Sequence, residues 1–424
     1  MNFSKNKLIL IAGVALLVIG VFLAFTWGKK PPIGSADNLV VWGVEESRVL
    51  GKAIEQYRKA NQGAEVRYVQ VPAESYEETL LSALAAGRGP DVLYISNHSL
   101  PKLRDVLAPL NPVTFSAEDF RQLFPTVATD DFVYQDKIYA LPLYIDTLAM
   151  VYNRDMFDRA SIASPPATWE EFQKLVPKLR ILNEKNQIVR AAVPIGGTEK
   201  TVNYATDILS LLMLQNGAEM INKDFTSARF AGKEGVAALD FYLQFSNPNY
   251  SYYTWNEAQR SSLDSFAAGE SAAVFAYKSD IPLIKAKNPF SAETLEVAPM
   301  LQVSEGSAVN YPDYWGLAVS AQSKHVASAW NFAMLLTTNE NAAKDYVFES
   351  GHPPALRSLL AGASNSAEFG VFAKQALSAR SWHTVDYGRI KEILNSAIVR
   401  AISGQVDTTQ ALREAAESVT LLMK

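Results

Sequence analysis

Cysteine is the residue that this sequence lacks altogether, because none of its 424 residues is a Cys. The absence rules out disulfide bonds, catalysis by a thiolate and metal sites built from Cys ligands. It also rules out a lipid attached through a Cys side chain. A chain without disulfides can still function in an oxidising compartment, so the missing Cys leaves the location of the protein open.

Positive charge is also scarce relative to negative charge. The chain has 39 Lys and Arg residues against 44 Asp and Glu residues, which gives a formal net charge of −5. No stretch combines Lys or Arg with interleaved aromatic residues, as a nucleic-acid-binding surface would. Nucleic acid is therefore not expected as a partner.

Enzyme motifs are missing as well. The chain contains no G-x-x-x-x-G-K-[ST] phosphate loop, no G-x-G-x-x-G after a strand, no G-x-S-x-G and no H-E-x-x-H. The four histidines lack the spacing of metal ligands; they are His98, His325, His352 and His383. The sequence therefore predicts a protein that is not an enzyme, with no cofactor and no metal site.

Paired acids occur at three places and have a structural explanation. They follow Ser75, Ser116 and Thr168, and in each case the second acid lies three residues after the hydroxyl residue. This is the spacing of a capping box, in which the hydroxyl and the acid satisfy free amides at the start of a helix. We interpret these acids as helix caps and not as catalytic carboxylates.

The sequence does contain a long apolar run without charge, from Leu8 to Trp27. At about 1.5 Å per residue, a helix of this length crosses a hydrocarbon core about 30 Å thick, and Trp27 would lie at the interface. The pattern predicts that residues 1–28 are a single-pass transmembrane anchor or uncleaved signal, and that residues 29–37 are a linker. A signal peptide cleaved near residues 34–36 is the alternative.

The remainder of the chain has the pattern of an α/β protein. From Asn38 onward, short apolar runs alternate with amphipathic helical segments, and the first expected strands are 38–43, 64–71 and 90–96. Short connections through helices imply parallel strands with right-handed crossovers. The length of the chain predicts two lobes, because a single core usually stops growing at a smaller size.

Six blocks, in order, resemble the family 1 extracellular solute-binding proteins of ABC importers, the group of maltose- and other sugar-binding proteins. The most specific is DKIYALPLYIDTLAMVYNRDMF followed by PPATWEEF, which is similar to the family segment G-K-x-Y-x-x-P…Y-Y-N-K-D-x-F…P-P-x-T-W-x-E. The other blocks are residues 40–61, 76–96, 265–277, 315–355 and 393–419. Members of this family in many bacteria carry a lipid-bearing Cys, and a transmembrane helix would replace that tether here.

The resemblance implies an α/β periplasmic-binding-protein fold of type II, in which two lobes joined by hinge segments enclose a ligand cleft. We expect a first lobe of residues 38–145 plus 300–350 and a second lobe of residues 146–299 plus 351–424. The implied function is that of a monomeric, membrane-tethered solute-binding protein at the extracytoplasmic face of the cell membrane. It would capture a sugar or oligosaccharide and deliver it to ABC permease subunits. Two alternatives stay open, a ligand-binding receptor for a sensor partner and a glycan-processing enzyme.

Candidate ligand-binding residues follow the expected strands. A sugar is recognised by flat apolar faces and planar polar groups, and ligands of open α/β sheets bind off the carboxyl ends of the strands. Trp42 and Glu45 lie at the end of the first strand, and Asn97 and His98 follow the third. Packing in the core is the alternative role for Trp42.

Five further candidates come from the blocks that carry the resemblance. Tyr144 and Asp146 lie at the expected first crossing between the lobes, where an extended backbone would point both side chains to the same side. An interlobe structural hydrogen-bonding role is the alternative for Asp146. Tyr277 follows the block AAVFA, and Tyr314 and Trp315 belong to YPDYWG, which resembles the family loop G-G-x-G-W-G. Trp315 is the preferred stacking residue.

Overall fold

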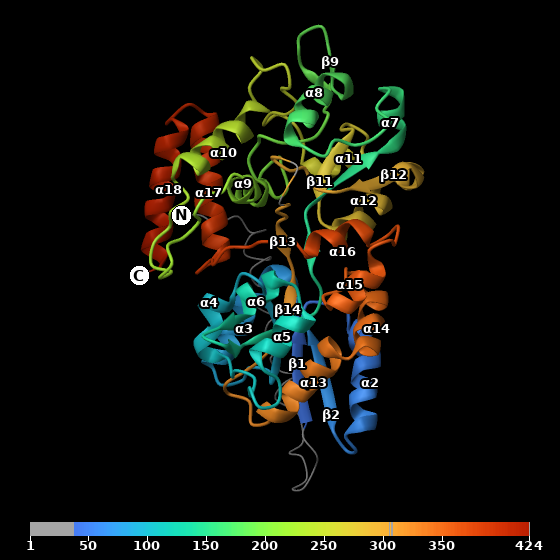
Figure 1. The fold of residues 1–424 in the computed structure, drawn as a ribbon, viewed down its shortest axis with the longest axis vertical. Coiled ribbons are helices and arrows are strands. Elements are labelled where there is room, and N and C mark those ends of the chain that lie inside the picture. The colour runs from blue at the N-terminus through green and yellow to red at the C-terminus, as the bar shows by residue number, and fades with distance from the viewer. Residues whose placement is uncertain (1–37, 305, 307, 424) are drawn as a thin grey trace, which may run out of the picture.

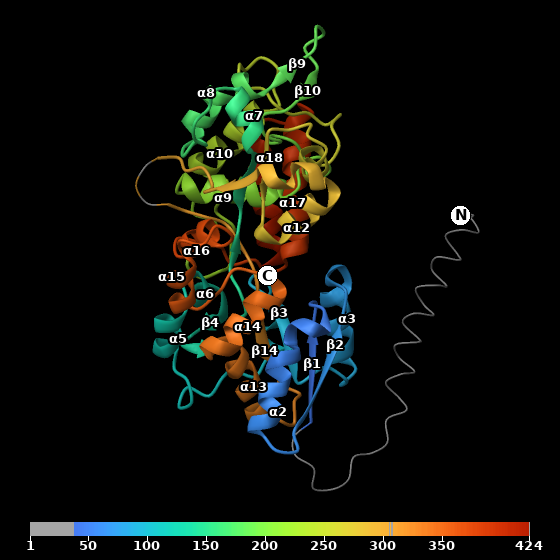
Figure 2. The same ribbon diagram turned by 90° about the vertical axis from the view of Figure 1, so that its right-hand side faces the viewer.

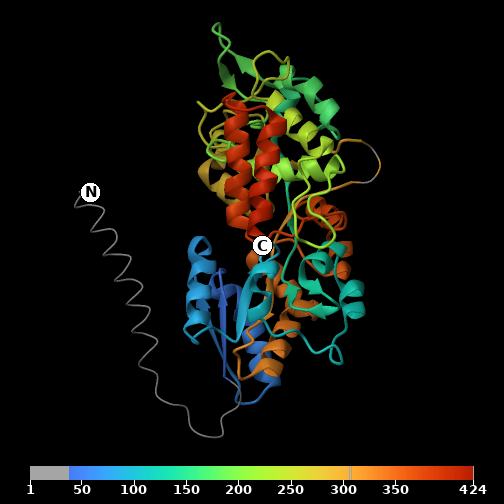
Figure 3. The same cartoon turned by 90° about the vertical axis from the view of Figure 1, so that its left-hand side faces the viewer.

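The structure, a computed structural model, describes residues 38–304, 306 and 308–423. Its buried apolar side chains form two large clusters, each around its own β-sheet. We call the parts that hold these clusters the first body and the second body. They lie at opposite ends of the long axis (Figure 1), and the two quarter-turn views agree (Figures 2 and 3). Most buried apolar residues of 39–145, 314–346 and 355–379 form the first cluster, and most of those of 148–309, Tyr311 and 382–419 form the second. A smaller third cluster joins Phe372 to residues of the second sheet.

The first body is built on a five-stranded sheet. Its strand order is β2 (Glu65–Gln70), β1 (Asn38–Gly43), β3 (Val92–Ser96), β14 (Trp315–Val319) and β6 (Ala140–Pro142). As the sequence predicts, β1 pairs in parallel with β2 and β3. Strand β14 begins more than 200 residues after β3 and is antiparallel to both β3 and β6.

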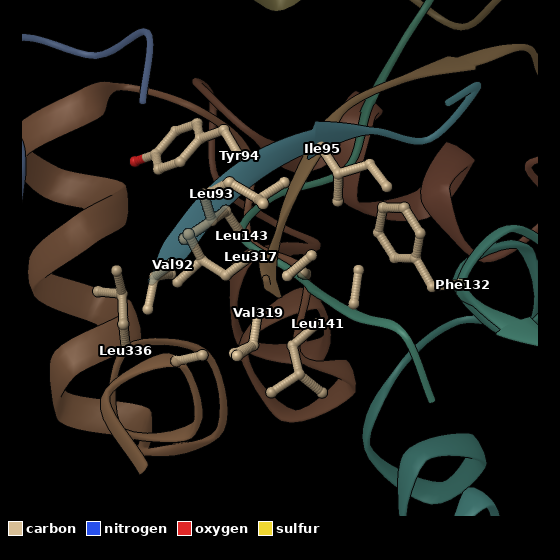
Figure 4. Close-up of a cluster of buried hydrophobic side chains, with 14 of the residues drawn as sticks. Val92, Leu93, Tyr94, Ile95, Phe132, Leu141, Leu143, Leu317, Val319 and Leu336 are labelled. Carbon is tan, nitrogen blue, oxygen red and sulfur yellow. The ribbon is translucent and has the colours of Figure 1, made fainter. Parts of the chain in front are cut away.

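Apolar side chains on both faces make β3 the centre of the first core. Figure 4 shows the labelled side chains of this strand among those of β14, of the segment around β6 and of two helices, which contribute Phe132 and Leu336. The labelled residues are Val92, Leu93, Tyr94, Ile95, Phe132, Leu141, Leu143, Leu317, Val319 and Leu336. Gly316 lies at a close approach within the sheet, because a Cβ there would be 2.7 Å from the carbonyl oxygen of Leu141 and from the ring of Phe132. A side chain at this position would therefore force the sheet apart.

The second body is built on the antiparallel sheet β11 (Ala273–Ala276), β8 (Ala149–Asn153) and β12 (Leu295–Ala298), in that order. Its helices are α7 (Arg154–Arg159), α8 (Trp169–Leu179), α9 (Ala205–Gln215), α10 (Lys233–Gln244), α11 (Ser262–Ala267), α12 (Ile281–Lys287), α17 (Tyr387–Ile402) and α18 (Thr408–Leu422). Helices α9, α10, α17 and α18 pack against one another. A short ribbon of β9 (Ile181–Leu182) and β10 (Ile188–Arg190) completes this body.

The helices of the first body flank its sheet (Figure 1). They are α2 (Gly51–Ala60), α3 (Tyr76–Ala85), α4 (Leu100–Leu103), α5 (Ala117–Leu123), α6 (Thr126–Phe132), α13 (Val326–Thr338) and α14 (Glu340–Ser350). A ribbon of β4 (Val133–Tyr134) and β5 (Lys137–Ile138) follows α6.

The chain crosses between the bodies in two paired segments. It leaves the first body through β7 (Asp146–Thr147) and returns through β13 (Pro312–Asp313), and these two strands form an antiparallel ladder. A third crossing lies between Ala379, which packs in the first cluster, and Trp382, which packs in the second.

The last part of the chain is divided differently from the sequence-based expectation, which assigned residues 351–424 to the second lobe. Helices α15 (Arg357–Ala363) and α16 (Gly370–Ala376) place Leu360, Ala373 and Ala376 in the first cluster. The guanidinium of Arg357 also donates to the carbonyl of Phe124 at 2.8 Å. Helix α15 therefore packs with the first body, whereas α16 contacts both bodies, because its Phe372 is buried with Val151 and Val274 of the second sheet.

The three predicted helix caps have different outcomes. Ser116 forms a complete capping box with Asp119 at the start of α5. Thr168 accepts from the amide of Glu171 at 3.2 Å, although that acid accepts from Ala167 rather than from the cap residue. The prediction for Ser75 is wrong, because it ends a 3₁₀ turn and lacks the extended backbone that an N-cap needs.

The predicted membrane anchor, Leu8 to Trp27, and the linker of residues 29–37 lie outside the described residues and stay predictions. Within the part of the chain that the structure describes, none of the helices has both the length and the apolar character needed to cross a bilayer.

Candidate functional site

The candidate site lies where the two bodies meet. Trp315 pairs with Ser96 at the carboxyl end of β3, and β14 is preceded directly by the crossing strand β13. The carboxyl end of β3 and the crossing ladder are therefore neighbours. This edge is where ligands of open α/β sheets are usually bound.

One group of candidates gathers beyond β1 and at the first crossing. The ring of His352 stacks on Tyr144, with centroids 3.9 Å apart and planes 4° apart. Its Nε2 atom lies 3.0 Å from a carboxylate oxygen of Glu45, which also accepts from the hydroxyl of Tyr346 at 3.3 Å. Sequence reasoning found Glu45 and Tyr144 but missed His352, because a single His without metal-ligand spacing gives no signal.

Trp315 and Trp42 have different positions. The Trp315 ring is partly exposed and meets Tyr76 edge-on at 5.4 Å and Tyr94 at 6.4 Å. One of its faces is thus supported by the first body. Trp42 is only 6% exposed and belongs to the first cluster, where its carbonyl accepts from the hydroxyl of Tyr76 at 3.1 Å.

Asn97 and Tyr314 form a brace behind the site with Asp131. The amide of Asn97 donates to the carbonyl of Tyr314, and the side-chain oxygen of Asn97 accepts from the amide of Tyr314 at 3.2 Å. The buried hydroxyl of Tyr314 donates to Asp131 at 2.6 Å. Burial raises the pKa of Asp131 to about 7, although hydrogen bonds from Ser381, Tyr314 and Asn97 oppose the shift.

Asp146 is 1% exposed, and its carboxylate is hydrogen-bonded by backbone amides. Its carboxylate accepts three N–H bonds of 2.8 to 3.0 Å, and the donors are Thr147, Lys278 and Ser279. Burial raises its pKa to about 6, and these amides and His352 oppose the shift. The carboxylate therefore ties the first crossing to the end of β11.

A second group joins the two bodies. The ring of His98, beyond β3, stacks on Tyr387 at the start of α17, with centroids 3.9 Å apart and planes 6° apart. Tyr311 lies on the same ring at 6.1 Å. The hydroxyls of Tyr387 and Tyr277 donate to the two oxygens of Asp207 at 2.7 and 3.1 Å. Of the predicted residues, the structure brings His98 and Tyr277 into this group.

Tyr204 and Lys391 border the second group. The Tyr204 ring meets Tyr277 edge-on at 4.8 Å, and its hydroxyl donates to Asp280 at 2.9 Å. Its backbone is left-handed, with φ of 64°, a conformation that a bulky residue rarely adopts. Burial acts to lower the pKa of Lys391. The charges of Asp207, Glu199 and Asp313 outweigh this effect, so the pKa of the lysine is raised.

His98 has no hydrogen-bonding partner for either ring nitrogen among the described residues, although it is only 2% exposed. Burial lowers its pKa to about 4, while Asp207 opposes this shift and Lys391 adds to it. The ring is therefore neutral at pH 7, with one nitrogen able to donate and the other able to accept.

Sequence reasoning missed several residues in or beside the second group, and five of them differ in the signals that could have found them. Asp207 interrupts an almost wholly apolar helix, the same kind of signal that drew attention to Asp146. Tyr311 and Asp313 lie in the quoted loop YPDYWG, beside the residues that were chosen. The others are Tyr387 and Lys391, which share one face of α17, but nothing local connects that helix with β3.

Comparison with known proteins now identifies the family. Residues 52–370 match the family model of the bacterial extracellular solute-binding proteins, which is more than half of the chain. The chain belongs to that family. Members bind solutes, which agrees with the expectation that the protein is not an enzyme. Within the described residues, no three His, Asp or Glu side chains are arranged to hold a metal ion.

Individual solute-binding proteins are similar at low identity. Binding proteins of Brucella abortus and Brucella suis are 28% identical over 234 residues, 54% of this chain and 52% of theirs. The chain thus spans about half the length of these relatives. The galactooligosaccharide-binding protein of Bacillus subtilis (strain 168) is 22% identical over 415 residues, which cover 90% of this chain and 88% of that one.

A solved structure confirms the fold. The cyclic α-maltosyl-1,6-maltose binding protein from Arthrobacter globiformis has a TM-score of 0.77 at 15% identity, and the match covers 92% of this chain and all of that one. The expected two-part α/β architecture of a periplasmic solute-binding protein is therefore present here.

Proposed function

We propose that this protein binds a sugar or oligosaccharide between its two bodies and delivers it to the permease of an ABC importer. The supporting observation is the convergence of ring and carboxylate side chains from both bodies at the crossing ladder. Flat rings beside planar polar groups are suited to a pyranose. The names of the Bacillus and Arthrobacter proteins, which refer to oligosaccharides, support the same solute class.

Binding is coupled to hinge motion in this proposal. We take the two bodies as the lobes that move, with β7, β13 and the segment after Ala379 as hinges. A ligand that touches Trp315 on the first body and Tyr387 on the second gains contacts only when the bodies are close together. It therefore shifts the population toward a closed form, which the permease recognises.

Membrane tethering is the second part of the proposal. The uncharged run from Leu8 to Trp27 would hold the folded body near the extracytoplasmic face of the membrane. A tethered binding protein stays close to its permease, which raises its effective concentration there.

The binding proposal is tested with full-length protein in detergent and a panel of oligosaccharides. A true ligand at about 100 times its Kd stabilises the folded state by about 2.7 kcal/mol, which raises the thermal midpoint. Replacing Tyr387 with Ala removes one wall of the site and is expected to abolish the shift. Tyr250→Ala is the matched control, since this Tyr of the second body is 39% exposed. A shift of equal size in both variants would contradict the site, and a panel without any binder would contradict the sugar class.

The tether is tested by fractionation. The full-length chain is expected in the membrane pellet after an alkaline wash, and a chain lacking residues 8–27 is expected in the supernatant. An uncleaved chain found only in soluble fractions would rule out the anchor.

A further inference from the structure

Asp313 is an acid with an unusual position. It lies in the crossing ladder directly opposite Asp146, and side chains of such a pair point to the same face. Like charges in this arrangement repel each other. Asp146 is compensated by three backbone amides, whereas the carboxylate of Asp313 accepts no hydrogen bond from the described residues. Asp313 is only partly buried, so a ligand can reach it.

The charges around Asp313 are mainly negative. Burial raises its pKa to about 7, and the charges of Asp207, Asp146 and Asp280 add to this shift. Lys391 opposes it, but among the described residues Glu199 is the only one with a carboxylate within 4 Å of the ammonium of this lysine, at 3.8 Å. The site therefore holds more negative charge than its lysine neutralises.

His98 is an independent observation that points to a ligand at the same place. Both ring nitrogens lack a partner, although the side chain is almost fully buried. Its ring lies on Tyr387, whose hydroxyl binds Asp207. Leaving such a group unpaired costs about 1–3 kcal/mol, so a donor or acceptor supplied by a ligand would recover that energy.

Aromatic faces add to the preference for positive charge. Tyr204 and Tyr387 are both partly exposed, and Lys391 already lies 6.0 Å and 5.5 Å from their ring centroids. Cations within about 6 Å of such a face are attracted by the ring quadrupole.

We propose that the saccharide bound here carries a free amino group, as in an unacetylated amino sugar, whose ammonium pairs with Asp313 while a neighbouring hydroxyl bonds to His98. This inference rests on the proposed function and narrows its solute class. In this proposal the carboxylates attract the ammonium and His98 binds a hydroxyl of the sugar, so both parts of the ligand are recognised.

The test compares ligands that share one backbone. Isothermal titration of the full-length protein is carried out at low salt with β-1,4-linked tetrasaccharides of glucose, N-acetylglucosamine and glucosamine. The glucosamine form is expected to bind at least tenfold more tightly than the other two. Its advantage should shrink with added salt, because screening weakens attraction between partly exposed charges.

Asp313→Asn supplies the residue test. In this variant the preference for glucosamine over glucose tetrasaccharide is expected to fall to within threefold. Asp105→Asn is the control of equal charge change, because this acid is 91% exposed on the first body; its preference should equal that of the native protein.

The outcomes separate the two proposals. If the glucose and glucosamine forms bind equally well, the amino-sugar inference is overturned and the proposed function stands. If a preference for glucosamine persists unchanged in Asp313→Asn, the assignment to Asp313 is overturned. If none of the three binds, and no other saccharide shifts the thermal midpoint, the proposed function fails together with the inference.

Discussion

Asp131 shows at the residue scale how a buried acid can serve the structure. It is 5% exposed, and its carboxylate accepts hydrogen bonds from the hydroxyls of Tyr314 and Ser381. Tyr314 belongs to the first body and Ser381 to the last crossing, so this carboxylate connects the brace behind the site to a hinge segment. Its burial is the reason that its pKa lies near 7.

This raised pKa predicts a pH dependence of stability. The folded state binds the Asp131 proton more tightly than the unfolded chain, so its contribution to stability is full below pH 3.8 and is lost as pH rises to about 7. Asp131→Asn removes this contribution. The free energy of unfolding of the native protein, minus that of the variant, should fall between pH 4 and pH 7 in denaturant titrations.

The free energy of unfolding is compared between the native protein and Asp131→Asn because other groups titrate in the same pH range. Asp146 and Asp313 have raised pKa values and act in the same direction, while the lowered pKa of His98 acts in the opposite one. These contributions cancel in the subtraction. Parallel curves for the native protein and Asp131→Asn would contradict the prediction.

Asp313 gives a second prediction at this scale. Because its partly buried carboxylate lies near like charges and accepts no hydrogen bond from the described residues, Asp313→Asn should raise the thermal midpoint of the ligand-free protein at pH 8. The gain should be smaller at pH 5, where the native carboxyl is already protonated. A variant less stable than the native protein at pH 8 would show that the charge is compensated.

At the scale of the element, equal sequence patterns have unequal structural outcomes. Ser116 and Ser75 each precede a helix, and each is followed by an acid at the third position. Only Ser116 has the extended backbone that lets its hydroxyl accept from the amide of Asp119. Ser75 lies in a helical turn and its side chain makes no cap bond.

The two serines are therefore a matched pair for measurement. Ser116→Ala should lower the free energy of unfolding by about 1 kcal/mol, the usual cost of a lost N-cap. Ser75→Ala should change it by a few tenths at most, because Ala has a high helix propensity and no cap bond is lost. Urea denaturation measures both, and equal costs would show that the cap geometry is irrelevant.

At the scale of the whole molecule, the crossings are tied together near Lys278. Its backbone amide donates to Asp146, and its buried ammonium donates to the carbonyl of Gly351 at 3.2 Å and to Glu368 at 3.0 Å. One residue thus connects the first crossing, the second body and the segments that precede and follow α15. The junction between the bodies is a network of polar contacts around a short ladder, which suits a hinge.

Breaking this network should destabilise the whole protein. Asp146→Ala leaves three amides without this acceptor, and each of the two buried ones, those of Thr147 and Lys278, costs about 1–3 kcal/mol. The ligand-free thermal midpoint should fall well below that of the native protein. Asp313→Asn, at the facing position of the ladder, is the control that leaves these amides bonded. An unchanged midpoint in Asp146→Ala would mean that water replaces the carboxylate.

Much of the fold could be predicted from local patterns. The strands β1 and β3 are short apolar runs, and the helices between β1, β2 and β3 imply their parallel pairing. The membership of Trp315 in a strand beside β3 could not be predicted in the same way, because β14 pairs with strands far away in the chain.

The candidate site was only partly predictable for the same reason. Residues at strand ends, such as Glu45 and His98, follow from the position of the strands. Tyr387 does not, because it reaches His98 from a helix that begins 289 residues later. Sequence reasoning selected Tyr314 rather than Tyr311 as a ligand-binding candidate. Which of the two rings faces the site depends on how their segment pairs with β7 and β3, and that pairing is not visible in the local sequence.

The sequence by itself determined the α/β class, the family and the strand-end candidates, because these depend on composition, periodicity and motifs within short stretches of chain. Only the tertiary structure decided that the carboxylate of Asp146 accepts from three amides while that of Asp313 accepts from no donor in the described part of the chain. The partners of a buried carboxylate come from distant segments, and two of the Asp146 donors lie more than 130 residues away along the chain. Which acid remains available to a ligand is therefore a property of the packing and not of the local sequence.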